Sequence, residues 1–149
     1  MALEKYLAIA GLALSVFFVA EIITLFNFMI NPEENDSFGF EAAPKIFQFI
    51  SLSIAPATIM IGASFILSKR YGSKLNGMLI IISGIIVLIG MIFAYTMIDD
   101  LKAELVDFTV EITPLLFMGV SIPIMIVGAR LLKTRPRKPK KDYLDDSNY

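Results

Sequence analysis

The stretch that decides the fold is residues 75–98, which read LNGMLIIISGIIVLIGMIFAYTMI and contain no charged side chain. At the 1.5 Å rise of an α-helix, a run of this length extends about 36 Å, more than the roughly 30 Å of hydrocarbon in a lipid bilayer. An uninterrupted apolar run that long is typical of a transmembrane helix. Residues 75–98 are therefore predicted to cross a membrane.

Three further apolar runs of comparable length occur at residues 6–30, 46–68 and 112–132. The whole chain is 56% hydrophobic with a mean hydropathy of +0.73, which is too apolar for a water-soluble domain. We therefore predict an all-α membrane protein with four transmembrane helices in one domain over residues 1–133. The remaining residues, 134–149, are predicted to form a charged tail, basic and then acidic.

The first apolar run is predicted to be a retained anchor helix and not a cleaved signal peptide. It is about 25 residues long, well beyond the 7–15 residues of a signal-peptide core. Its only early cation, Lys5, adjoins Glu4, and Phe18 disrupts a small-x-small cleavage site ending at Ala20.

The distribution of charge predicts the orientation, because Lys and Arg in the connections of a membrane protein remain cytoplasmic. One side of the predicted four-span chain holds only Lys45 and Lys102, together with nine acidic residues. The other side collects eleven basic residues: Lys5, Lys69, Arg70, Lys74, Arg130, Lys133, Arg135, Arg137, Lys138, Lys140 and Lys141. We expect a multi-pass protein of the plasma membrane with both termini in the cytoplasm.

Two finer features of the fold are suggested by the sequence. Each predicted hairpin runs helix, acidic loop, Pro, mid-helix Pro, Gly-Ala pair and basic exit, which suggests a parallel two-hairpin repeat, although apolar helices also resemble one another by chance. The matched residues are Pro44 and Pro114, Pro56 and Pro123, and Gly62 and Gly128. In the third span, Gly77, Gly84 and Met91 recur every seven residues and predict a packed helix face.

The acidic connection at residues 99–113 contains a helical pattern of apolar residues. Leu101, Leu105, Phe108 and Ile112 recur at i, i+4, i+7 and i+11, opposite a row of acids. This spacing predicts a short amphipathic outer helix that lies on the membrane surface or prolongs a span.

Glu21 is the one ionisable side chain predicted to lie deep in the hydrocarbon, about four residues beyond the middle of its helix. Such residues are costly in a membrane and often functional. No Lys or Arg of this chain is expected at the same depth, since Arg130 lies near the opposite end of its span. The carboxyl must therefore be protonated and hydrogen-bonded, solvated in a cavity, or paired with another subunit.

Several residues of the other spans are expected at the depth of Glu21. Proline removes a backbone donor, so Pro56 should free the carbonyl of Leu52 and Pro123 that of Gly119. The intramembrane polar site predicted on this basis comprises Glu21, Ser53, Pro56, Gly90, Gly119, Ser121 and Pro123. Its role is a static structural one, a contact between subunits, or transfer of an ion or proton.

The basic run after the last span is a candidate site for anionic lipid headgroups, at about 1 kcal/mol per cation near the surface. Its cations are Arg135, Arg137, Lys138, Lys140 and Lys141. The alternative is that this run only stops translocation and sets orientation.

The residues that carry most chemistry are missing, because the chain contains no Cys and no His. Thiol chemistry, the usual zinc sites and imidazole bases are thereby excluded. The sequence also lacks a phosphate-binding loop and a nucleophile paired with a base, and the clustered acids lack the spacing of a calcium loop. We expect no metal, cofactor or nucleic acid to bind, and no catalytic activity of the chain itself.

These absences favour a small accessory or structural subunit of a larger membrane complex, with other membrane proteins and lipids as partners. In size and topology the chain looks like the helper subunits of prokaryotic respiratory complexes or of membrane-bound copper monooxygenases such as archaeal ammonia monooxygenase, an analogy of shape alone. The alternative is a small oligomeric ion channel or transporter in which Glu21 from several copies lines a pathway.

Overall fold

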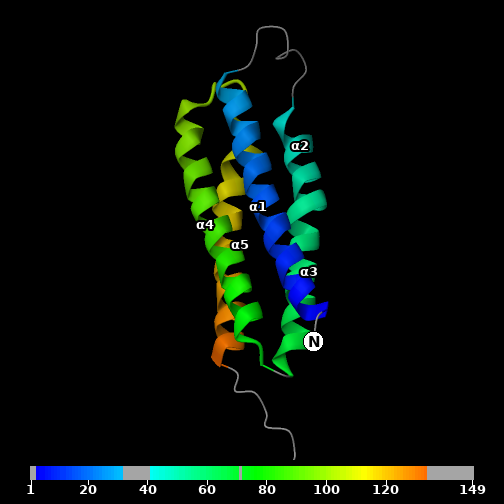
Figure 1. Ribbon diagram of the computed structural model, residues 1–149. Coiled ribbons are helices and arrows are strands. Elements are labelled where there is room, and N and C mark those ends of the chain that lie inside the picture. The colour runs from blue at the N-terminus through cyan, green and yellow to red at the C-terminus, as the bar shows by residue number, and fades with distance from the viewer. Residues whose placement is uncertain (1–2, 32–40, 71, 134–149) are drawn as a thin grey trace, which may run out of the picture.

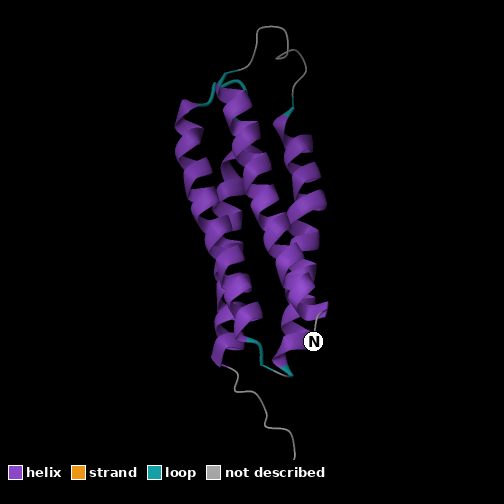
Figure 2. Ribbon diagram, viewed as in Figure 1, coloured by secondary structure: helices purple, strands orange, loops and turns teal. Residues whose placement is uncertain are grey.

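The computed structural model describes residues 3–31, 41–70 and 72–133, and within them it contains helices and short connections but no strand (Figure 2). The elements are α1 (Leu3–Ile30), α2 (Ala42–Phe49), a π-helical turn (Ile50–Ile54), α3 (Ala55–Lys69), α4 (Lys74–Met97), a 3-10 turn (Ile98–Asp100) and α5 (Phe108–Lys133). Because α2, the π-helical turn and α3 form one continuous rod, the described chain has four helices long and apolar enough to cross a membrane. Within the described residues the predicted all-α class is confirmed, as are four helices with the length and apolar composition needed to span a membrane.

The four rods lie side by side in a bundle (Figure 1). α1 begins at the end of the bundle where α5 ends and where α3 turns into α4. We call this the terminal end. The opposite end, where α1 ends, α2 begins and residues 101–107 connect α4 to α5, is the loop end.

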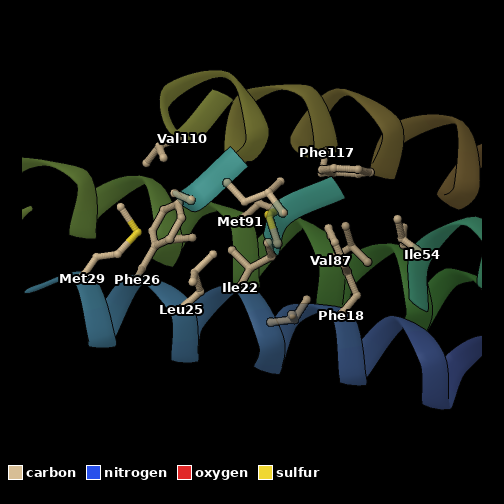
Figure 3. Packing of buried hydrophobic residues seen from close by; sticks show 14 of the residues in the cluster. Phe18, Ile22, Leu25, Phe26, Met29, Ile54, Val87, Met91, Val110 and Phe117 are labelled. Atoms are coloured by element: carbon tan, nitrogen blue, oxygen red, sulfur yellow. The ribbon is translucent and has the colours of Figure 1, made fainter. Parts of the chain in front are cut away.

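The core lies between α1, α4 and α5, and the second span contributes buried residues such as Ile46 and Ile54 to it (Figure 3). Phe18, Val87 and Met91 are buried there, and the ring of Phe18 meets that of Phe117 edge-on, with 4.7 Å between centroids. In a bilayer, apolar side chains gain little by leaving lipid, so such contacts stabilise the bundle through close packing and dispersion.

The seam between α4 and α5 depends on small residues. A Cβ on Gly77 would lie 3.0 Å from the carbonyl oxygen of Gly128, and one on Gly128 would lie 2.8 Å from that of Gly77. Seven residues along each helix, Gly84 faces the backbone of Ser121 in the same way. Met91, the next residue in this repeat, is fully buried. The predicted packed face of the third span is confirmed.

The second span is interrupted by the π-helical turn just before Pro56. The N–H of Ala55 donates to the carbonyl of Ile50, five residues back, where an α-helix would use the residue four back. Pro56 has no N–H to donate to Leu52, and its ring would crowd that carbonyl in a regular α-helix. A widened turn at this point relieves the crowding and changes which way the residues within it face.

The connection between α4 and α5 differs from the prediction. Of the two predicted alternatives, a separate helix on the membrane surface is wrong, since residues 101–107 are not helical. The other alternative, the prolonging of a span, holds in part, because the 3-10 turn prolongs α4, and Phe108 and Ile112 belong to α5. Leu101 is buried in the core instead of lining a helix surface. At the start of α5, the carboxylate of Asp107 accepts a hydrogen bond from the N–H of Phe108 and its carbonyl accepts one from the N–H of Val110, both at 2.8 Å.

The residues matched in the two-hairpin repeat lie in different environments. A Cβ on Gly62 would meet no atom within 4 Å, whereas Gly128 packs directly against α4. Pro56 follows a π-helical turn and is half-buried, but Pro123 lies within α5 and is exposed. The repeat therefore gains no support from the packing of these residues.

Candidate functional site

Glu21 forms a hydrogen bond within the membrane-spanning region. The hydroxyl of Ser53 donates to Oε2 of Glu21 across 2.5 Å, and Ser53 is fully buried. Ser53 lies in the π-helical turn, so the irregularity next to Pro56 determines where this hydroxyl sits. Of the residues grouped with Glu21 in the predicted polar site, the structure thus brings Ser53 into hydrogen-bond contact with it.

The carboxyl of Glu21 is far from either end of its helix. Glu21 lies nine residues before Ile30, the last residue of α1, which corresponds to about 13 Å along the axis. Helical side chains lean toward the N-terminus of their helix, so the carboxyl lies deeper still than its own Cα. In a bilayer this group would be surrounded by hydrocarbon unless protein or water covers it.

A groove of about 510 Å³ runs between α1 and α2 beside this carboxyl. We call it the α1–α2 groove, and its lining residues are Phe17, Ala20, Glu21, Thr24, Leu25, Phe28, Lys45, Gln48 and Phe49. Thr24, Lys45 and Gln48 are exposed and Glu21 is partly exposed, so the groove opens on the outside of the bundle. Four polar side chains thus line a groove on the outer surface of the bundle.

Polar groups occur at several positions along the α1–α2 groove. Lys45 lies in the first turn of α2, near the loop end, whereas Glu21 lies about two turns deeper on α1. Gln48, one turn beyond Lys45, supplies an amide between them. The groove can therefore donate and accept hydrogen bonds at several depths, but it holds no nucleophile paired with a base.

Of the other residues of the predicted polar site, Pro56 follows the π-helical turn that holds Ser53, whereas the four on α4 and α5 lie apart from this pair. Among the described residues, Ser53 alone hydrogen-bonds to Glu21. Gly90 faces Val19 so closely that a Cβ there would collide with it, and Ser121 donates to the carbonyl of Met118 in its own helix at 2.6 Å. Gly119 and Pro123 are exposed on α5. Gly90 therefore serves the contact of α4 with α1, and Ser121 lies on the α4–α5 seam opposite Gly84.

Two groups of polar residues escaped the sequence reasoning. Thr24, Lys45 and Gln48 were not linked to Glu21, although Thr24 at i+3 on the same helix was a usable signal.

The second group lies at the terminal end, where buried Ser and Asn side chains stabilise the turn between α3 and α4. Asn76 donates from Nδ2 to the hydroxyl of Ser68 at 2.7 Å, and Ser73 caps the start of α4. Their spacing across a short connection resembles an ordinary turn, so nothing in the sequence distinguished them.

The predicted headgroup-binding cations Arg135, Arg137, Lys138, Lys140 and Lys141 lie outside the described residues. Within the described part of the chain, no group of three or more acidic side chains is arranged to hold a metal ion. Comparison of the chain with protein-family models, with curated proteins and with solved structures gives no match.

Proposed function

We propose that this chain is a non-catalytic accessory subunit of a larger integral membrane complex, and that the α1–α2 groove receives a transmembrane helix of a partner subunit. The observation that carries the proposal is the exposure of Glu21, Thr24 and Gln48 on the outer surface of the bundle, within a membrane-spanning region. Intramembrane carboxyl and amide groups are expensive when they face lipid tails.

The hydrogen bond from Ser53 satisfies one oxygen of Glu21, which leaves the other available on the groove side. Acyl chains offer no hydrogen bond, and a phospholipid headgroup would have to descend about 13 Å below the end of α1 to reach this depth. A polar side chain on a neighbouring helix can reach it without such a displacement, because hydrogen bonds between helices are common in membrane proteins.

The shape of the groove also fits a helix. On α1, Ala20 and Thr24 are small residues one turn apart, and both are exposed. Small residues at this spacing allow helix backbones to approach closely in lipid. Phe17 and Phe28 line the groove one turn before and one turn after them, so a stretch of small residues lies between two bulky ones along this face of α1.

The same proposal includes the location and orientation of the chain in the plasma membrane, with the terminal end in the cytoplasm. Support comes from the described cations, which gather at the terminal end as Lys5, Lys69, Arg70, Lys74, Arg130 and Lys133, against Lys45 and Lys102 near the loop end. The basic run after α5 would add contacts with anionic lipid headgroups. Helper subunits of prokaryotic respiratory complexes or of membrane-bound monooxygenases, such as archaeal ammonia monooxygenase, are similar in size and span number.

A second candidate is a small oligomeric channel or transporter. It would need several copies to turn their α1–α2 grooves toward a shared axis, because the interior of a single bundle is filled by apolar side chains such as Phe18, Ile22 and Met91. The outward position of Glu21 and Lys45 in one groove is compatible with that arrangement. The two candidates differ in what covers the groove: a foreign helix or further copies of this chain.

Purification of the tagged chain from its own membranes in a mild detergent separates these candidates. The accessory-subunit proposal predicts defined foreign membrane proteins in fixed ratio to this chain. A stable homo-oligomer without foreign subunits would favour the channel. A monomer that carries only lipid from its own membranes would contradict both.

A further inference from the structure

A second pocket, of about 340 Å³, lies between α4 and α5 at the loop end. We call it the α4–α5 pocket, and its lining residues are Tyr95, Ile98, Asp99, Phe108, Glu111, Ile112 and Leu115. The α4 side contributes residues at i, i+3 and i+4, and α5 contributes residues at i, i+3, i+4 and i+7. Each helix thus turns one continuous face toward the pocket.

The lining combines two carboxylates with two aromatic rings. Asp99 and Glu111 bring negative charge from opposite walls, and none of the described residues that line the pocket is cationic. Tyr95 and Phe108 are 50% and 72% exposed, so both rings remain available to a ligand. Aromatic faces attract organic cations, and carboxylates complete the charge match.

We propose that the α4–α5 pocket binds the ammonium group of a zwitterionic phospholipid, either choline or ethanolamine. A calcium ion is a poorer match, since it takes six to eight oxygen ligands and this pocket offers two carboxylates, one phenol and apolar walls. The methyl or methylene groups of an organic ammonium fit those walls, whereas a bare inorganic ion does not.

The position of the pocket favours a lipid over a soluble amine. Asp99 lies in the 3-10 turn that ends the third span, and Glu111 lies in the first turn of α5, so both carboxylates are near the depth of lipid headgroups. Ile112 and Leu115 lie at the next positions toward the membrane interior and are 36% and 54% exposed. They form an apolar path for the acyl chains below the headgroup. This inference does not depend on the occupant of the α1–α2 groove.

Native mass spectrometry of the full chain, released from bilayers of equal phosphatidylcholine and phosphatidylglycerol, tests the assignment. We expect one phosphatidylcholine to be retained in preference to phosphatidylglycerol. The D99N/E111Q double variant should lose that preference, because the charge match is removed. Asp100→Asn is the matched control, since Asp100 is exposed beside Asp99 but does not line the pocket, and it should keep the preference.

A variant of one aromatic side chain tests whether the rings contribute to the lipid preference in addition to the two carboxylates. Phe108→Leu keeps an apolar wall and both carboxylates, and it should weaken the preference roughly twofold to fivefold, the scale of one exposed cation–π contact. Equal retention of both lipids by the unaltered chain would overturn the assignment, as would an equal loss in Asp100→Asn. Displacement of the lipid by millimolar tetramethylammonium would show a site for soluble amines and would also overturn it.

Discussion

Ser53 and Glu21 lie 32 positions apart in the chain, yet the hydroxyl of one donates to the carboxyl of the other across 2.5 Å. The bond links the π-helical turn of the second span to the deep part of α1. It holds the Glu21 side chain at the edge of the α1–α2 groove, where the side chain is partly exposed. The main predictions about function follow from this pair.

Substitution of Glu21 should separate a structural from a transporting role. Glu21→Gln keeps the length of the side chain and an oxygen that accepts from Ser53, so assembly and activity of the complex should remain nearly intact. Glu21→Ala removes both and should weaken assembly by about 1 kcal/mol, typical of hydrogen bonds between membrane helices. Quantitative co-purification checks this. A Gln variant that assembles normally but loses all activity would support the channel instead.

Ser53→Ala should destabilise the bundle by about 0.5–1.5 kcal/mol, because it leaves the Glu21 carboxyl without its partner in the described chain. Ser51→Ala is the matched control: Ser51 is exposed and donates to the carbonyl of Phe47 in its own helix. Unfolding in mixed micelles measures both. In a double-mutant cycle, Ser53→Ala and Glu21→Ala should couple by roughly 0.6 kcal/mol. Strictly additive effects would mean that the pair does not interact.

Gly128→Ala should destabilise the α4–α5 seam by about 1–3 kcal/mol, since its Cβ would lie 2.8 Å from the Gly77 carbonyl oxygen and 2.9 Å from the Ile81 nitrogen. The backbone atoms there cannot move aside without separating the helices. Gly62→Ala makes the same chemical change where nothing lies within 4 Å, and it should be neutral or slightly stabilising. The change in melting temperature should therefore differ in sign or size between the two variants. Equal decreases in both would contradict close packing of α4 against α5 at Gly128.

The orientation can be tested cleanly because the chain contains no cysteine. A single cysteine in place of Lys102, in the connection at the loop end, should react with a membrane-impermeant maleimide added to intact cells. A cysteine in place of Arg70, at the terminal end, should react only after permeabilisation. Both positions are exposed, so accessibility within the protein does not confound the comparison. Labelling of both cysteines from the same side of the membrane would contradict the four-span topology.

The fold could be predicted from the sequence because a bilayer imposes a strict length on apolar helices. The runs at 6–30, 46–68, 75–98 and 112–132 all lie within described spans, which extend a few residues farther at most ends. The π-helical turn was not predicted, since Pro56 indicates a disturbed helix but not the form of the disturbance. A separate outer helix did not form: the chain leaves the helical path at Leu101, which is buried in the core, and only Phe108 and Ile112 of the predicted stripe lie in a helix, as part of α5.

The site was predictable only in part. Depth counting brought Glu21 and Ser53 together correctly, because both belong to adjacent spans of one hairpin. Depth along a helix does not show which way a residue faces around that helix. Gly119 and Pro123 were therefore grouped with Glu21 although they are exposed on α5. Helix rotation depends on which small residues form the close seams, and the pairing of Gly77 with Gly128 is a property of two helices together. Neither helix alone determines it.

A photocrosslinking residue placed at Phe17 tests the central claim most directly. Phe17 lines the α1–α2 groove and is 55% exposed, while Ile59, on α3 outside the groove, is 72% exposed and serves as the control position. Irradiation of native membranes should join position 17 to a transmembrane segment of a defined foreign subunit, identified by mass spectrometry, and position 59 should not give that adduct. Adducts of position 17 with lipid alone, or only with a second copy of this chain, would contradict the accessory-subunit assignment.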